Sequence, residues 1–190
     1  MTAFVDVIRP ETKSRRRVFD ALCIVGGSLF LALMAQCAIP LGFTPIPITL
    51  QTFGVMLLGA LLGSKKGSLA VVLYLIEGML GLPIFALGMA GPTVLFGPTG
   101  GYLFAFVPSA FLAGILLERG WKKSYMGTLV ALTLSTLLTL GIGALWLSVF
   151  VGGKAAVTLG VYPFLIGGAI KVLVAAAMIP SGWKLLQAFR

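Results

Sequence analysis

Residues 81–101 constrain the fold more than any other stretch, because they combine helix-breaking residues with a complete absence of charge. The segment reads GLPIFALGMAGPTVLFGPTGG and holds six glycines and three prolines. Glycine and proline at this density interrupt helices, while Phe85, Met89 and Leu95 favour burial. An irregular apolar segment must satisfy its backbone polar groups away from lipid, so we expect it to cover a site inside the protein.

The remainder of the chain is apolar enough for a membrane. Of its 190 residues, 59% are hydrophobic and only 10% are charged, which is too little polarity to cover a water-soluble surface. We therefore expect an all-α integral membrane protein whose helices form one bundle. The predicted domains are a basic cytoplasmic tail, 1–18, and a six-helix transmembrane substrate-binding domain, 19–190.

Six apolar runs predict six transmembrane helices. They cover residues 19–39, 50–63, 67–80, 101–117, 127–151 and 163–186. The second and third runs are too short to cross a hydrocarbon core of about 30 Å, so the adjoining loops must supply the missing length. One of these loops is 81–101, and the other is the proline-rich segment 40–52. We expect both to dip into the membrane and to roof a cavity among the helices.

The basic residues predict the orientation of the chain. Twelve of the 14 Lys and Arg residues precede the first run, lie between the second and third or the fourth and fifth, or lie at the C-terminal end of the chain. The positive-inside rule then places both termini in the cytoplasm, for a multi-pass protein of the cytoplasmic (inner) membrane, with the two Gly/Pro-rich loops outside. The net charge of +9 thus indicates topology and contact with membrane lipid, and we expect no nucleic-acid partner.

Small residues recur every fourth position in two of the predicted helices. The stripes are Gly101, Ala105, Ser109 and Ala113 in the fourth, and Gly127, Ala131, Ser135, Thr139 and Gly143 in the fifth. In lipid such stripes let helix backbones approach closely. We expect them to pack the bundle internally, with docking of another protein as the alternative.

Two charged residues fall inside predicted spans away from their ends, Glu77 and Lys171. A charge at the bilayer centre costs on the order of 2.5–3.5 kcal/mol, so each needs a partner, water or a ligand. One interpretation is an ion pair between the two residues. A second is that Lys171 holds an anionic group of a ligand, while Glu77 or nearby backbone accepts ligand N–H groups. A third is a helix face exposed to water. The neighbouring Gly167 and Gly168 would let a ligand approach the helix backbone closely.

Other chemistries lack their residues. The chain has no histidine, and Cys23 and Cys37 are separated by about 21 Å along one predicted helix, so we expect neither a metal site nor a disulfide between them. No phosphate-binding loop with its Gly-Lys-Ser/Thr ending is present. We therefore expect no cofactor and no enzymatic activity, and any ATP hydrolysis must come from partner subunits.

Four stretches resemble the BioY family, the biotin-binding S components of energy-coupling-factor transporters. They are PIPITLQT at 45–52, YLIEGMLGLPIF at 74–85, FGPTGGY at 96–102 and YPFLIGGAIK at 162–171. The resemblance covers nearly all of the chain after the basic tail. It implies a six-helix membrane protein that captures biotin with high affinity from outside, under its first and third loops. It also implies two kinds of partner, a membrane scaffold subunit and two cytoplasmic ATPases.

The candidate site residues follow from these stretches. The expected ligand-binding residues are Lys171, Glu77, Tyr74, Gln51, Phe85, Gly97, Thr99, Gly100 and Gly168. The resemblance also implies that small residues of the first helix, here Ser28 and Ala32, contact the scaffold subunit.

The sequence departs from the family pattern at one place. The family usually reads Pro-Gly-Asp where this chain has Ile166, Gly167 and Gly168, so the carboxylate expected at Gly168 is missing. We hypothesise that Glu77 supplies the acidic group from a facing helix. The alternative is a different ligand, such as a biotin precursor, or relaxed specificity.

Two other functions stay open on the sequence alone. One is a structural or assembly subunit of a membrane complex, which the small-residue stripes and the missing carboxylate would suit. The other is a secondary carrier for a small organic anion, in which Glu77 would couple transport to protons.

Overall fold

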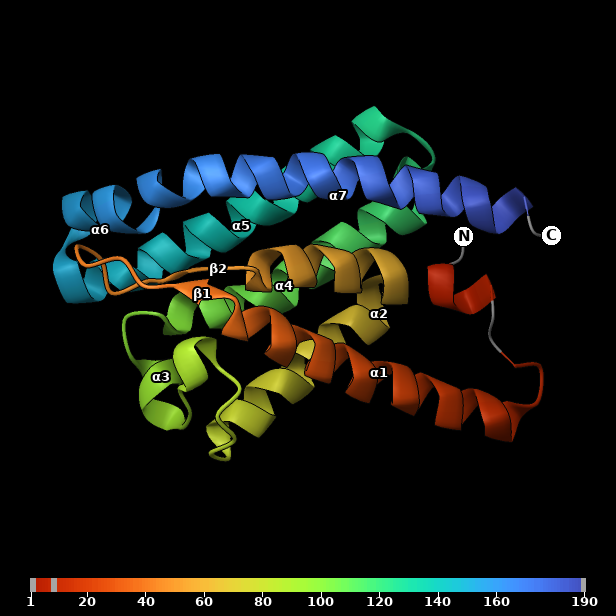
Figure 1. Ribbon diagram of the computed structural model, residues 1–190, viewed down its shortest axis with the longest axis horizontal. Helices are drawn as coiled ribbons and strands as arrows, with labels where there is room; N and C mark the ends of the chain where they lie inside the picture. The colour runs from red at the N-terminus through yellow and green to blue at the C-terminus, as the bar shows by residue number, and fades with distance from the viewer. Residues whose placement is uncertain (1–2, 8–9, 189–190) are drawn as a thin grey trace.

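The computed structural model describes residues 3–7 and 10–188, and its ten helical elements form one elongated bundle (Figure 1). The helices are η1 (Phe4–Val7), α1 (Lys13–Gln36), α2 (Gln51–Met79), η2 (Ala86–Gly88), α3 (Pro92–Phe96), α4 (Gly100–Glu118), η3 (Trp121–Lys123), α5 (Tyr125–Val151), α6 (Gly153–Gly160) and α7 (Tyr162–Ala188). Two short strands, β1 (Ala38–Ile39) and β2 (Ile48–Thr49), pair antiparallel.

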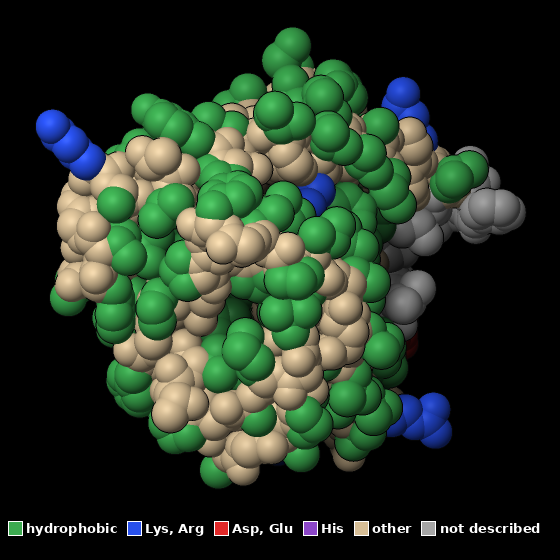
Figure 2. All heavy atoms as spheres, turned by 60° about the vertical axis from the view of Figure 1, so that its left-hand side comes forward, with side chains coloured by type: hydrophobic (Ala, Val, Ile, Leu, Met, Phe, Trp, Pro, Cys, Tyr) green, Lys and Arg blue, Asp and Glu red, His purple; other side chains and the backbone are tan. Residues whose placement is uncertain are grey.

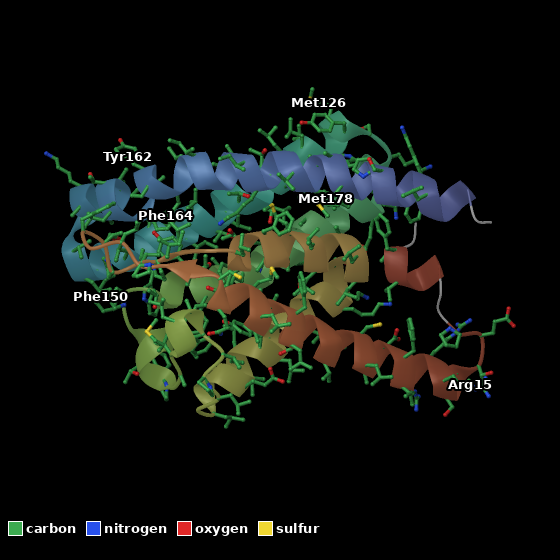
Figure 3. All side chains as sticks on the ribbon, in the orientation of Figure 1. Arg15, Met126, Phe150, Tyr162, Phe164 and Met178 are labelled. Atoms are coloured by element: carbon green, nitrogen blue, oxygen red, sulfur yellow. The ribbon has the colours of Figure 1, made fainter. Side chains whose placement is uncertain are left out.

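The bundle has two distinct ends. The terminal end holds η1, the start of α1 and the end of α7, whereas the strands, α3 and α6 lie at the opposite, loop end (Figure 1). Arg15 lies at the terminal end, while Phe150 and Tyr162 lie at the loop end (Figure 3). The two Gly/Pro-rich loops are therefore at the end away from most of the basic residues, as the charge distribution predicts. Arg9 and Arg190, which contribute to that prediction, lie outside the described residues.

Helix α2 consists of two arms joined at Gly63. The backbone of Gly63 is not helical, with φ 83° and ψ 177°, a region that only glycine adopts readily. The chain reverses direction there (Figure 1), and the arms pack closely because Gly67 has no side chain: a Cβ at Gly67 would lie 2.7 Å from the Leu58 carbonyl oxygen. The sequence predicted a break at 64–66, but these residues belong to the second arm.

The carboxylate of Glu118 caps the second arm of α2. It accepts hydrogen bonds from the Ser64 backbone N–H at 2.8 Å and from the Ser64 hydroxyl at 2.9 Å. The first N–H groups of a helix have no partner within the helix, so an acceptor from the end of α4 satisfies one of them and joins the two helices.

We expect Glu118→Ala to lower the free energy of unfolding by about 1–2 kcal/mol, because the Ser64 N–H loses its acceptor. Glu118→Gln keeps one side-chain oxygen and should lose less stability. Thermal denaturation of the parent and the two variants, purified in one detergent, measures the order of their stabilities. A glutamine variant as unstable as the alanine variant would contradict the capping role.

Close packing of α4 on α5 confirms the predicted use of the small-residue stripes. The Ser135 hydroxyl donates to the Ser109 carbonyl at 2.9 Å, and the Thr139 hydroxyl donates to the Ser109 hydroxyl at 2.7 Å. All three residues are buried. Small side chains thus let the two helices approach, and their hydroxyls find partners across the contact.

Five helical segments of the described chain are long and apolar enough to cross a membrane, which confirms a multi-pass helical protein. They are Lys13–Gln36, Gln51–Met79, Gly100–Glu118, Tyr125–Val151 and Gly153–Leu185, so both arms of α2 fall in one segment. The fourth, fifth and sixth predicted runs agree with α4, α5 and α7. The first helix begins at Lys13 and therefore includes part of the predicted tail.

Candidate functional site

A cavity of about 80 Å³ lies at the loop end of the bundle, between the two Gly/Pro-rich loops and the helices. This space would hold several water-sized groups, since one water needs about 10–15 Å³. Figure 2 turns this end toward the viewer: hydrophobic and uncharged surface covers most of it, and a hollow opens near the middle. The cavity is the candidate ligand pocket.

Six structural elements supply the walls of the pocket. Residues 37–50, called the first loop below, and residues 80–99, the second loop, both contribute, as the sequence predicted. The lining includes Ile46, Thr49, Gln51 and Thr52 from the first loop and the start of α2; Phe85, Met89 and Thr99 from the second loop; Tyr102 and Phe106 from α4; Thr136 and Thr139 from α5; and Phe164, Gly167, Gly168 and Lys171 from α7.

Lys171 projects into this pocket from α7. Its ammonium donates hydrogen bonds to the backbone carbonyl of Thr49 and, at 3.0 Å, to the hydroxyl of Thr52. Both acceptors are uncharged, and no carboxylate among the described residues forms a salt bridge with Lys171. The pocket therefore presents a positive charge that no described carboxylate neutralises, which favours an anionic ligand group there.

The first loop is held in place from both sides. Strands β1 and β2 pair at its base, and the Leu50 N–H donates to the Cys37 carbonyl at 3.1 Å. The Thr44 hydroxyl donates to the Leu159 carbonyl in α6 at 2.9 Å. Because prolines interrupt the helical pattern here, the sequence predicted an extended or turn conformation, but not the strand pairing.

The second loop is anchored by Phe85, whose side chain is fully buried. The ring occupies a space that exists because residue 78 is glycine: a Cβ at Gly78 would lie 2.2 Å from the ring. Phe85 also makes an edge-to-face contact with Tyr74, with ring centroids 5.5 Å apart. Phe85 thus forms a fixed wall of the pocket.

The Gly97–Gly100 segment shapes the pocket in two ways. Thr99 lines the pocket, and its hydroxyl donates to the Val94 carbonyl at 3.2 Å. Gly97 and Gly100 do not line it. The Gly97 carbonyl accepts a hydrogen bond from the Trp146 indole at 2.9 Å, and a Cβ at Gly100 would collide with the Leu95 carbonyl. These two glycines permit the loop conformation, whereas the sequence predicted that they would bind ligand.

Gln51 and Tyr74 are joined by a hydrogen bond of 2.8 Å, but only Gln51 lines the pocket. Tyr74 lies behind it, fully buried, and its hydroxyl donates to the Ile84 carbonyl at 3.1 Å. The sequence placed both residues in the site. The structure makes Gln51 part of the lining and Tyr74 its support.

Glu77 is not among the lining residues, contrary to the expectation that it faces the pocket. Its carboxylate accepts a hydrogen bond from the Ser28 hydroxyl of α1. The alternative ion pair with Lys171 does not form either, because Lys171 bonds Thr49 and Thr52. Hydrogen bonding within the bundle therefore accounts for this intramembrane carboxylate. The structure gives no support to Glu77 as a substitute for the missing acidic group at Gly168.

Ser28 and Ala32, the expected scaffold contacts, are buried inside the chain. Their side chains are 0% and 9% exposed, respectively. The small side chains allow α1 to pack on α2, where Glu77 lies opposite Ser28. Neither residue is on the free surface of α1, so the structure corrects the expected placement of these two residues.

Sequence reasoning missed several pocket residues on α5 and α7. Thr136 and Thr139 line the pocket from α5, and Phe164 lines it from α7. Thr136 lies across from Gly168, whose added Cβ would be 3.5 Å from the threonine methyl group. The threonine hydroxyls within an otherwise apolar run could have indicated pocket residues, but such residues equally serve helix packing.

Comparisons with known proteins agree on one family. Residues 10–188 match the model of the BioY family. The chain is 40% identical over 174 residues to a Thermotoga maritima protein named biotin transporter BioY, covering 91% of this chain and 95% of that protein. It is 42% identical over 151 residues to a probable biotin transporter BioY of Pyrococcus horikoshii, covering 78% and 88% of the two chains.

A solved structure has the same fold. It is the crystal structure of the S-component for biotin from an ECF-type ABC transporter. The TM-score is 0.82 at 28% identity, and the match covers 92% of this chain and 95% of that one.

Proposed function

The chain belongs to the BioY family, and from this premise we propose that its pocket binds biotin for uptake, as the substrate-specific component of an energy-coupling-factor transporter. The pocket suits such a ligand. Biotin carries a carboxylate, a urea with N–H donors and a largely apolar ring system, and pockets for small molecules combine apolar walls with a few well-placed polar groups. Lys171, Gln51 and the threonine hydroxyls are those groups here.

The observation that carries the proposal is the ammonium of Lys171 beneath two uncharged loops. It is half-buried, bonded only to uncharged oxygens among the described residues, and open to the cavity. A carboxylate that enters the pocket gains a charge-assisted hydrogen bond in surroundings of low polarity. A purely structural subunit would have no need for such a chamber, and a carrier driven through Glu77 would need that residue in the pocket.

We propose six passes through the cytoplasmic membrane with both termini in the cytoplasm. The reversal of α2 at Gly63 makes two passes of one apolar segment. Lys66 lies near the start of the second arm of α2, and Lys122 and Lys123 belong to η3. These segments are near the terminal end, since α2 contacts η1 and the Lys122 ammonium lies 3.9 Å from the centre of the Trp183 ring of α7, and the positive-inside rule places this end in the cytoplasm. The loop end and the pocket mouth then face outward.

The energy for uptake comes, in this proposal, from partners. A scaffold membrane subunit and two cytoplasmic ATPases would form the complete transporter, since the sequence contains no phosphate-binding loop. Movement of the loaded bundle against the scaffold subunit would then deliver biotin to the cytoplasm.

Biotin binding to the isolated, detergent-purified chain tests the proposal. A ligand that binds only the folded state stabilises it, by about 2.7 kcal/mol at a concentration 100 times the Kd. We therefore expect biotin to raise the midpoint of thermal denaturation, and titration calorimetry should give a saturable isotherm.

The control ligand is a small carboxylate without the urea ring, such as valerate, which should stabilise far less. A chain that is helical by circular dichroism but gains no stability from biotin would refute the proposal. Stabilisation by a biotin precursor and not by biotin would show that the missing family carboxylate has changed the ligand.

A further inference from the structure

Three groups form a chain of hydrogen bonds from the pocket to the second loop. The side-chain nitrogen of Gln51 lies 2.8 Å from the Tyr74 hydroxyl, which lies 3.1 Å from the Ile84 carbonyl oxygen. Gln51 is 3% exposed and Tyr74 is 0% exposed, so water does not compete for these bonds. Of the described residues that line the pocket, Gln51 alone carries a side-chain amide.

The direction of these hydrogen bonds is fixed by the Ile84 carbonyl. A carbonyl oxygen only accepts, and two oxygens 3.1 Å apart repel each other unless a proton lies between them. The proton on this line must come from Tyr74. Gln36 also donates to the Ile84 carbonyl, at 3.3 Å, but that bond does not remove the repulsion between the carbonyl and the Tyr74 oxygen.

The orientation of the Gln51 amide follows from this direction. Because the single proton of the Tyr74 hydroxyl is used on Ile84, its oxygen must accept a hydrogen bond from Gln51, and the Gln51 –NH₂ group must face Tyr74. The amide oxygen then remains for a group in the pocket, and no described residue donates a hydrogen bond to it. A flipped amide would leave two acceptor oxygens facing each other without a proton, either Gln51 against Tyr74 or Tyr74 against Ile84.

We propose that Tyr74 is a positioning residue that holds Gln51 as a hydrogen-bond acceptor, so that the pocket selects a ligand with an N–H donor at this point. The inference rests on the proposed function, and it identifies the ligand group as a urea N–H of biotin. Tyr74 does not line the pocket and acts only through Gln51. A buried acceptor left without its donor is costly, which is why such a contact discriminates strongly.

The test compares biotin with its two cyclic carbamate analogues, in which oxygen replaces one or the other urea N–H. The replacement nearly preserves shape but turns the donor into an acceptor. In the parent chain one analogue should bind at least about tenfold more weakly than biotin, since a lost hydrogen bond with an opposed acceptor exceeds about 1.4 kcal/mol. In Tyr74→Phe the amide of Gln51 can flip and donate, so the difference between biotin and that analogue should fall below about threefold.

Two further variants separate positioning from a general loss of structure. Gln36→Leu removes a different hydrogen bond to the same loop, because Gln36 donates to Ile84 and Phe85 and is not hydrogen-bonded to Gln51. This variant should keep the full discrimination of the parent. Gln51→Met should lose the discrimination, and adding Tyr74→Phe to it should change nothing more, as expected when one residue acts through the other.

Failure of this inference can be distinguished from failure of the proposed function. If the parent binds biotin but does not discriminate against either carbamate, or if Tyr74→Phe keeps the discrimination, the inference is wrong while biotin binding stands. Equal losses in Tyr74→Phe and Gln36→Leu would also refute it, because the effect would then come from the loop. If the folded parent does not bind biotin, both fail together.

Discussion

Lys171→Met is expected to weaken biotin binding by about 10- to 100-fold, the largest loss of function we expect from a single substitution. A hydrogen bond to a charged group is worth about 1.5–3 kcal/mol, and each 1.4 kcal/mol is a factor of ten in affinity. Methionine keeps the length and the apolar stem of the side chain, so the loss isolates the ammonium. Titration calorimetry with biotin measures it directly.

The matched control is Lys154→Met. Lys154 is at the same end of the bundle, in α6, but it is exposed and does not line the pocket. This substitution removes the same charge and should leave the affinity within about twofold of the parent, because exposed charges are screened. Biotinamide lacks the carboxylate charge, so Lys171→Met should lower its affinity less than it lowers the affinity of biotin. Similar losses in both lysine variants would contradict a specific role for Lys171.

Gly114→Ala is expected to lower the free energy of unfolding by roughly 2–3 kcal/mol, the upper part of the range for overpacking. Gly114 in α4 contacts the backbone of the α2 turn: its added Cβ would lie 2.4 Å from the Ser64 nitrogen and 2.5 Å from the Ser64 Cα. Backbone atoms at a tight turn cannot move aside cheaply, so the two helices must separate. Denaturation in a fixed detergent measures the loss.

Gly141→Ala provides the matched control for this prediction. Gly141 lies in α5 with no atom within 4 Å of its added Cβ. An alanine there relieves the entropic cost of a helical glycine, so stability should stay constant or rise by about 0.5–1 kcal/mol. If Gly114→Ala lowers the free energy of unfolding and Gly141→Ala does not, the contact between α4 and α2 is the cause of the loss. Equal changes in the two variants would rule that cause out.

The overall fold follows from the sequence because apolar length and Gly/Pro clusters are local signals. The predicted runs 101–117, 127–151 and 163–186 agree closely with α4, α5 and α7, and both irregular loops line the pocket. The turn within α2 was misplaced for a physical reason. Polar residues 64–66 suggested a connection, but the chain turns at Gly63, where the backbone conformation favours glycine, and Glu118 caps the helix that follows.

The site was predictable only in part. Five of the predicted site residues line the pocket: Lys171, Gln51, Phe85, Thr99 and Gly168. They could be predicted because each belongs to a stretch that resembles a known family. Glu77 was misplaced since its partner, Ser28, is 49 residues away in sequence, and no local pattern reveals such a contact. The same contact buries Ser28, which the sequence placed on a surface for another protein.

A layer of buried apolar side chains lies next to the pocket on the side of the terminal end. Met56, Leu132 and Ala175 lie one helical turn beyond the lining residues Thr52, Thr136 and Lys171, and they belong to one buried apolar cluster. At the far side of this cluster, Phe4 of η1 packs edge-on against Trp183, with ring centroids 5.0 Å apart. Packed apolar core therefore lies between the pocket and the terminal end in the part of the chain that the structure describes.

This packed layer has a thermodynamic consequence for transport. Tight binding opposes release, because every contact that lowers the free energy of the bound state also raises the free energy needed for biotin to dissociate. With packed core on that side of the pocket, release of a bound ligand toward the terminal end requires the bundle to change conformation. The tighter the binding, the larger the free energy that this change must supply for each molecule released.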